Sequence, residues 1–434
     1  MPLINTRVQW AVGQGFFHSA ALIEDDELRL RYVYDCGAKA LYEEARSNRV
    51  DELVVSVGRG ERLDLLFLSH VHEDHVNGVE QLLDGTTGLQ VDTIVLPLLG
   101  VEDRLIAFAR SVSEDPAAAG NGFYRDLVAD PIGTLSRFNP RQILLVRSGG
   151  PDGGAPGSDD RPVGRPDGGG EISGLRDDKG RASWKLVGRG DVQQVAATQL
   201  GASADTAARV AVIDDSLALA TSSRDDAHLW LFAPFVDPLV EDARDEFLEA
   251  LADSLKMSIG SLQVWLKDVV NVEDLVVNHV GKLKSAYTVI TANLNITTMS
   301  LYSGPERPMG DEARWQRARF GKWVVQGGED VAWLGTGDAA LKQKSRRTAF
   351  LDHYDLLLRQ VITLTMPHHG SDHNFHVELL DRIEPSFCIA AADKFLDWKH
   401  PGPHAAQSVA STGRFLSVVT SNPLSTVVET VRIG

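Results

Sequence analysis

Short apolar runs separated by polar residues dominate the first hundred residues. The run Tyr32–Tyr34 stops at Asp35–Gly37, and the run Leu65–Leu68 is continuously apolar. A continuous apolar run of this length is typical of a strand that is buried on both faces of its sheet. The pattern therefore predicts short strands joined by turns, followed by helical structure over residues 101–129.

The same pattern returns from about residue 296. The predicted strands are Thr298–Tyr302, Val331–Leu334, Val361–Leu364 and Phe387–Ala390. Between the two β-rich parts, apolar residues recur at helical spacing, which predicts one helix that begins after Asp237 and a second that begins at Asp274. The chain is thus expected to have two β-rich halves with an α-rich segment between them.

Glycine and proline concentrate in one stretch of the middle segment. From Ser148 to Gly170 there are 9 Gly and 4 Pro in 23 positions. Such a stretch has too much backbone freedom and too little apolar area to order itself. We expect a flexible surface loop or a linker over residues 148–170.

Potential metal ligands follow directly after the apolar run Leu65–Leu68. Three histidines and a carboxylate stand within six residues, as His70, His72, Asp74 and His75. Imidazole nitrogens and carboxylate oxygens are ligands for zinc, manganese or iron. Alternation along the chain places His70 and His72 on one side, and the other two can then face a second ion. The spacing favours a metal site over a solvated polar loop.

Three more clusters of polar side chains follow predicted strands. Thr336–Asp338 brings one carboxylate forward on a glycine turn, although such a motif alone is more often an ordinary turn. His368 and His369 are adjacent, and we expect one to be a ligand and the other to be available for proton transfer or for the charge of the transition state. His400 follows in Lys399–His404, for which a surface turn is the alternative.

Together these four motifs resemble the metallo-β-lactamase-fold hydrolases, which use a His-x-His-x-Asp-His loop with one or two metals. The pairing of Thr336–Asp338 with His368–Ser371 resembles one branch in particular, the hydrolase domain of competence DNA-uptake channel proteins. The resemblance implies an α/β fold, a four-layered αββα metallo-β-lactamase sandwich with a large, mainly helical insertion. Residues 1–98 and 290–434 would be the two halves of this domain, and residues 99–289 would be the insertion.

The resemblance also implies a dinuclear centre that holds two divalent metal ions, zinc or manganese. Its implied ligands are His70 and His72 for the first metal, Asp74, His75 and His369 for the second, and Asp338 as the bridge. Asp35 would lie behind the metal loop. Many family members supply a third histidine to the first metal, and in this interval the chain offers His228 and His279, so we expect an open or loosely held first site.

Asp74, His368 and His400 are the expected catalytic groups. On the resemblance, His368 and His400 line the pocket as acid or oxyanion stabiliser, or one of them is an extra ligand. The residues support metal-assisted hydrolysis, in which an activated water attacks phosphorus or a carbonyl carbon.

The net charge argues against one class of substrate. The chain has 43 Lys+Arg and 60 Asp+Glu, a formal charge of −17, and a field of this sign repels nucleic acid and anionic membranes. Two local sets of bases oppose this field. Residues 131–190 hold ten bases against seven acids, and the second set is Lys342, Lys344, Arg346 and Arg347.

Cys36 and Cys388 each lie in an apolar run, which suits reduced, buried thiols. The chain shows neither a leader-like start nor about 18 consecutive apolar residues. We expect a cytoplasmic protein with no membrane partner.

Three functions stay open from the sequence. The favoured one is a phosphodiesterase or nuclease, and the second is a hydrolase of a small ester, lactone or thioester. In the third, residues 99–289 dock a protein partner, because relatives of this stand-alone type occur in bacterial defence systems. The third can accompany either of the first two.

Overall fold

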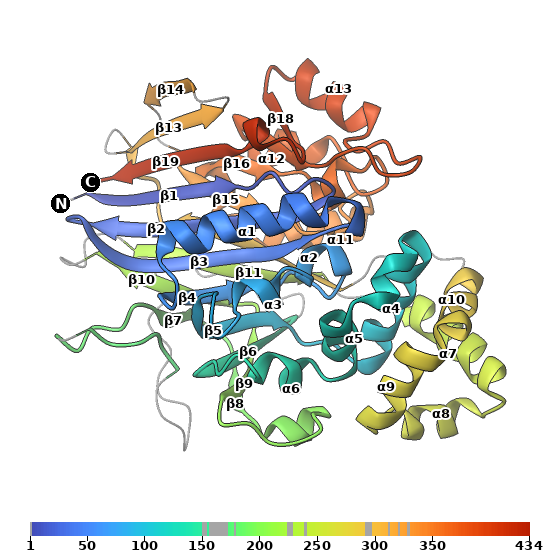
Figure 1. The fold of residues 1–434 in the computed structure, drawn as a ribbon. Helices are drawn as coiled ribbons and strands as arrows, with labels where there is room; N and C mark the ends of the chain where they lie inside the picture. Colours follow the sequence, from blue (N-terminus) through green and yellow to red (C-terminus); the bar gives the residue numbers. More distant parts are fainter. Residues whose placement is uncertain are drawn as a thin grey trace.

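The computed structural model describes residues 2–149, 154–155, 172–177, 179–223, 229–237, 241–290, 297–310, 313–319, 322–327 and 330–434. It is a mixed α/β structure with two β-sheets, and the N- and C-termini lie close together (Figure 1). Most of the predicted loop 148–170 lies outside the described residues. Only positions 148–149 and 154–155 of this loop are described.

Eleven strands form the first sheet within the described part of the chain. In spatial order they are β14 (Lys322–Gly327), β13 (Arg314–Arg319), β19 (Val427–Ile433), β1 (Leu3–Gln9), β2 (Gly15–Glu24), β3 (Glu27–Ala38), β4 (Arg62–Phe67), β5 (Gln90–Pro97), β6 (Gln142–Arg147), β9 (Arg209–Asp214) and β8 (Val192–Gln194). Strands β3, β4, β5, β6 and β9 run parallel to one another. This parallel part carries the predicted runs Tyr32–Tyr34 and Leu65–Leu68, the latter ending just beyond β4.

The second sheet has eight described strands. In spatial order they are β18 (Phe415–Val419), β17 (Phe387–Ala391), β16 (Val361–Thr365), β15 (Ala332–Gly335), β12 (Thr298–Pro305), β11 (Leu229–Asp237), β10 (Leu217–Ser222) and β7 (Lys185–Gly188). Strands β15 to β18 are parallel, so the chain segments that follow β15 and β16 leave the same edge of the sheet.

Helices lie outside the two sheets, and α7 to α10 are set to one side of them (Figure 1). They are α1 (Glu43–Val57), α2 (Glu73–Val76), α3 (Val79–Leu82), α4 (Val101–Glu114), α5 (Gly122–Ala129), α6 (Pro131–Ser136), α7 (Glu241–Leu255), α8 (Ile259–Trp265), α9 (Val269–Asn278), α10 (Val280–Val289), α11 (Lys344–His353), α12 (Glu378–Ile383) and α13 (Pro403–Ser411). One core joins the first sheet to α1, α4, α5 and α7, another joins the second sheet to α11 and α12, and a third lies between the sheets.

The segment 99–289 contributes to both sheets as well as to the helices. It supplies β6, β8 and β9 to the first sheet and β7, β10 and β11 to the second. Helices α7 to α10 pack beside α4 and α5 (Figure 1). The division of the chain into 1–98, 99–289 and 290–434 stays a prediction.

One predicted helix boundary is wrong. The helix expected from Asp274 begins at Val269, and the Asp268 carboxylate accepts a hydrogen bond from the Val270 amide at this end. The chain then leaves the helical conformation at His279, where α9 ends and α10 begins. Both thiols are buried and free, as expected. Among the described helices, none combines the length and the apolarity needed to cross a membrane.

The core between the sheets contains an aromatic cluster around Phe232. Its ring lies 5.0 Å from that of Tyr32 and 6.1 Å from that of Phe67, and it is fully buried. We expect Phe232→Ala to lower the free energy of unfolding by about 3–5 kcal/mol, measured by chemical denaturation. The control Val55→Ala, at a position 68% exposed on α1, should stay within about 0.5 kcal/mol of the parent. Equal effects of the two substitutions would contradict this packing.

Candidate metal centre

The predicted ligands lie on chain segments that follow three parallel strands. His70, His72, Asp74 and His75 follow β4, and Asp338 follows β15. His368 and His369 follow β16, in a short 3-10 turn at Pro367–Gly370. β15 and β16 are parallel neighbours in the second sheet, whereas β4 belongs to the first sheet, so the ligand segments from the two sheets meet at the site.

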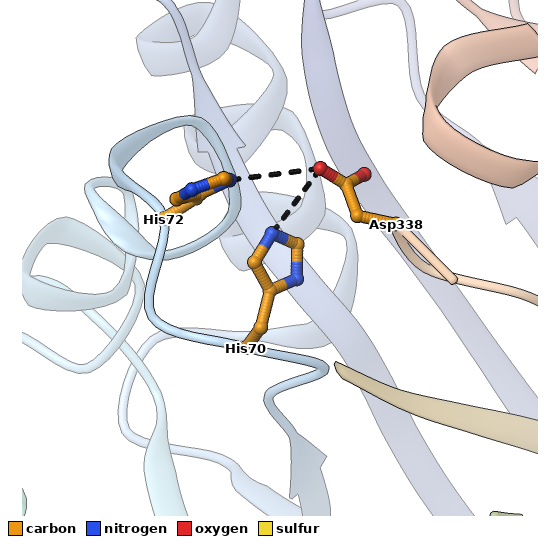
Figure 2. Close-up of side chains that lie close together, drawn as sticks. All are labelled: His70, His72 and Asp338. Atoms are coloured by element: carbon orange, nitrogen blue, oxygen red, sulfur yellow. Dashed lines mark ion pairs between the residues drawn. The ribbon is translucent and has the colours of Figure 1, made fainter. Parts of the chain in front are cut away.

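The first group of potential ligands surrounds one oxygen of Asp338. His70 Nε2 lies 3.5 Å from Asp338 Oδ2, and His72 Nδ1 lies 3.6 Å from the same oxygen. Figure 2 shows the two imidazoles turned toward this carboxylate. All three side chains are buried.

The second group contains Asp74, His75 and His369, which are also buried. His75 Nε2 lies 3.5 Å from Asp338 Oδ1, and His369 Nε2 lies 3.4 Å from Asp74 Oδ2. Asp338 therefore presents one carboxylate oxygen to each group, as a bridging ligand would. The structure brings together all six residues that the resemblance named as ligands.

Acceptors behind the imidazoles fix the protonation of two loop histidines. His75 Nδ1 lies 2.8 Å from Asp35 Oδ2, so it carries the proton and donates to this carboxylate. The Ser69 hydroxyl donates to Asp35 at 2.6 Å, and its oxygen can then accept from His70 Nδ1 at 2.8 Å. Asp35 lies behind the loop as expected. In His70, Nε2 keeps its lone pair, which faces Asp338, and His75 Nε2 faces the same carboxylate.

His369 has the same arrangement on the opposite side. Its Nδ1 donates to the carbonyl oxygen of Ala391 at 2.8 Å, which leaves the Nε2 lone pair facing Asp74. His368 and His369 have φ values of 48° and 57°, in the left-handed region that non-glycine residues avoid. Each costs on the order of 1–3 kcal/mol, and strain of this kind concentrates at functional sites.

The convergence of these atoms fits a divalent cation. Nε2 of His70, His75 and His369 and Oδ1 of Asp338 are buried and have no hydrogen-bond partner among the described residues. Buried lone pairs that face carboxylate oxygens repel one another unless a cation lies between them. Nitrogen and oxygen donors of this kind suit zinc and manganese alike.

Burial keeps most of these imidazoles neutral, which is the form that binds metals. It is the main cause that lowers the imidazole pKa of His70, of His72 to about 3, of His368 to about 4 and of His400 to about 3. Burial also acts on His75, but Asp35 and Asp338 outweigh it and raise its pKa to about 10. Burial favours the neutral acid of Asp338, but His368, His70 and His75 hold its pKa well below the ordinary range.

His368 also presents a lone pair to the centre. The Asn374 amide nitrogen donates to the carbonyl oxygens of Asp338 and Ala339, so its oxygen faces His368 Nδ1 at 3.1 Å. Nδ1 therefore carries the proton. His368 Nε2 lies 3.5 Å from Asp338 Oδ2, the oxygen that also faces His70 and His72.

His400 has the opposite tautomer. Gln14 Oε1 accepts from the Asp393 amide at 3.3 Å, so Gln14 Nε2 is the atom that donates to His400 Nδ1 at 3.2 Å. The other nitrogen of the neutral ring, Nε2, then carries the proton. His400 can therefore donate a hydrogen bond from Nε2, whereas His368 can only accept one at its Nε2.

Three charged side chains connect the metal loop to α4. Lys39 Nζ lies 3.3 Å from Asp74 Oδ1 and 3.2 Å from Glu114 Oε2, and Glu114 accepts from Arg110 Nε at 2.8 Å. The Lys39 ammonium also lies 5.5 Å from the centroid of the Trp398 ring. Burial lowers the pKa of Lys39, but the two carboxylates outweigh it and raise the pKa above its ordinary value.

A pocket of about 1030 Å³ lies beside the centre. Residues from the segments 99–289 and 290–434 line it, among them Arg110, Tyr287, Lys342, His368, Trp398 and His400. Another pocket, of about 680 Å³, has no predicted ligand in its wall. Substrate could thus reach His368 and His400.

The two predicted sets of basic residues differ in their position relative to the pocket. Lys342 of the second set lines the pocket. Arg346 donates to Asp237 at 2.6 Å and Arg347 to Glu378 at 2.7 Å, so both hold neighbouring segments. No described base of residues 131–190 lines this pocket, whereas Arg137 and Arg141 line the smaller one.

The two histidines weighed for a third ligand do not complete the first group. His228 lies outside the described residues. His279 lies between α9 and α10, with Nε2 3.2 Å from Asp274 Oδ2, and it belongs to neither described group of ligands.

Sequence reasoning missed Lys39, Glu114, Arg110, Gln14 and Asn374. Arg110 and Glu114 stand four residues apart on a predicted helix, which indicates an ion pair. No local pattern shows that this pair reaches the centre. Gln14 and His400 are 386 positions apart, so the sequence gives no signal for their contact.

No protein-family model and no curated protein matches the chain.

The Asp35 carboxylate should control metal affinity. In Asp35→Asn one carboxylate oxygen behind the loop is replaced by an amide, and the hydrogen bond that orients His75 weakens. We expect metal affinity to fall about 10–100-fold in calorimetric titration with Zn²⁺. The control Asp64→Asn changes a buried carboxylate on β4 outside the centre and should leave affinity unchanged. Equal losses in both variants would refute this role.

Lys39 should be important for stability. Lys39→Met leaves Asp74 without its ammonium partner and Glu114 with Arg110 alone. We expect the free energy of unfolding of the metal-free protein to fall by about 3–5 kcal/mol in urea denaturation. Lys342→Met, at an exposed position, is the control and should change it by less than about 0.5 kcal/mol. A loss of under about 1 kcal/mol for Lys39→Met would contradict the charge network.

Proposed function

We propose that the protein is a metal-dependent hydrolase of the metallo-β-lactamase fold and that it acts on phosphodiesters. The observation that carries the proposal is Asp338, whose two oxygens each face a separate group of imidazole nitrogens at 3.5–3.6 Å. Two facing sheets with helices outside them agree with the αββα sandwich that the motifs suggest. The position of the ligands after the ends of strands also agrees with this sandwich.

His70, His72 and Asp338 would hold one divalent ion, and Asp74, His75, His369 and Asp338 the other. When bound, such a pair of ions supplies an activated water and polarises the substrate oxygen. Asp35, Ser69 and the Ala391 carbonyl keep three of the imidazoles oriented. His400, with its proton on Nε2, would donate a hydrogen bond to a substrate oxygen as negative charge develops on it.

The charges of the pocket favour a phosphodiester. Arg110, Lys342 and Lys399 line it. Three acids also line it, Glu114, Asp372 and Asp397. Glu114 is paired with Arg110 and Lys39, and Asp372 accepts from the backbone amides of His404 and Ala405. Arginine and lysine are the usual partners of phosphate oxygens. The charge of −17 opposes long nucleic acids more than short phosphodiesters, and whether the substrate is nucleic acid stays open.

A small ester, lactone or thioester is the second candidate. The pocket has a bounded volume of about 1030 Å³, and Tyr287, Ile290 and Trp398 give part of its wall an apolar character. Such a lining suits an uncharged acyl group. The docking of a protein partner on residues 99–289 and a role in defence stay predictions.

The test combines metal analysis with turnover. Purified protein should contain up to two ions of zinc or manganese per chain and should hydrolyse bis(p-nitrophenyl) phosphate. Asp338→Asn removes the bridging charge and should lower turnover by at least about 100-fold, because weaker changes behind a ligand already cost 10–100-fold. Asp64→Asn is the matched control. Turnover of a lactone alone would favour the second candidate, and turnover that Asp338→Asn leaves intact would refute the proposed centre.

A further inference from the structure

One imidazole lone pair beside the metal centre has two competing partners. Arg110 Nη2 lies 3.2 Å from His368 Nε2, and this nitrogen lies 3.5 Å from Asp338 Oδ2. Asn374 holds the proton on Nδ1, so Nε2 can only accept. A single lone pair can bind an arginine N–H or a metal ion, but not both at once.

His368 Nε2 faces the Asp338 oxygen that the first group shares, although His368 is not among the three residues of that group, whose donor atoms all lie within 4.8 Å of one another. Its distance of 3.5 Å from Asp338 Oδ2 equals that of His70 Nε2 and is close to the 3.6 Å of His72 Nδ1. Three imidazole nitrogens thus face one carboxylate oxygen. Three histidines are a common ligand set for a catalytic zinc ion.

Arg110 is held firmly enough to compete for this lone pair. It extends from α4, and Glu114, one turn further along the helix, accepts from its Nε at 2.8 Å. Glu114 also contacts Lys39, whose ammonium lies 3.3 Å from the second-group ligand Asp74. The guanidinium is thereby fixed on the pocket wall with Nη2 directed at His368.

We propose that Arg110 is a positioning residue that sets the affinity of the first metal site by competing for His368 Nε2. While Arg110 donates to Nε2, the first ion has His70, His72 and Asp338 as ligands. When Arg110 releases Nε2, His368 completes the site as a third histidine. This inference rests on the proposed metal centre, and it assigns control of that centre to the segment 99–289.

The experiment is a calorimetric titration of metal-free protein with Zn²⁺, with bound ions counted by mass spectrometry. In Arg110→Met the weaker of the two binding constants should become about tenfold tighter, since one hydrogen bond to Nε2 no longer has to be broken. The stronger constant should not change. Lys342→Met removes another pocket cation, one that donates to the Asp372 carbonyl, and is the control.

A double-mutant cycle separates competition from charge repulsion. In a His368→Ala background, Arg110→Met should leave both constants unchanged, because the contested lone pair is gone. If the constant tightens equally there, Arg110 acts through its charge alone and the inference is wrong. Arg110→Lys gives a second reading, because lysine keeps the positive charge but lacks Nη2, the nitrogen directed at His368, and it should tighten the weaker constant in the same direction.

The outcomes also distinguish this inference from the proposed function. If wild-type protein binds no metal, or if Asp338→Asn leaves binding intact, the proposed centre itself fails. If wild-type protein binds two ions and Arg110→Met has the same two Zn²⁺ binding constants as wild type, the proposed centre is supported and the role of Arg110 is refuted.

Discussion

The structure depends on one electrostatic constraint, the burial of many acceptor atoms around Asp338. Imidazole nitrogens from His70, His75 and His368 lie 3.5 Å from its two oxygens. Such a cluster is unfavourable by itself, because buried acceptors such as His70 Nε2 have lost water without gaining a donor. A divalent cation in each group would reverse this balance. The segments after β4, β15 and β16 must all be held in place for the cluster to exist.

The hydrogen bonds behind His70, His75, His368 and His369 all place an acceptor at Nδ1. Behind three of the histidines an acceptor occupies Nδ1: the Ala391 carbonyl, the Asp35 carboxylate and the Ser69 hydroxyl oxygen. Asn374 does the same for His368, and its own orientation is fixed by two backbone carbonyls. Partners of this kind fix which nitrogen can bind a metal and raise its basicity. A loop that was polar only for contact with water would need none of them.

The local parts of this site could be predicted from the sequence. His70, His72, Asp74 and His75 directly follow an apolar strand, and Asp338 and His369 also stand at strand ends, so a short pattern carries the information. Contacts across the fold could not be predicted in this way. Arg110 reaches His368 over 258 positions, and the joining of β6 and β9 to the first sheet depends on pairing that apolar runs do not specify. The break at His279 was missed because the apolar spacing continues through it.

The charge of the centre bears on the objection raised by the net charge of −17. Asp35, Asp74, Asp338 and Glu114 are four carboxylates, and the cations among them are Lys39, Arg110 and His75, whose pKa is raised to about 10. Without metal this cluster repels an anion, as the rest of the molecule does. Two divalent ions would make it positive, and Arg110 and Lys342 would extend that sign into the pocket. An anionic substrate would then be attracted only at the loaded centre, so a strongly acidic surface and a phosphodiester substrate are compatible.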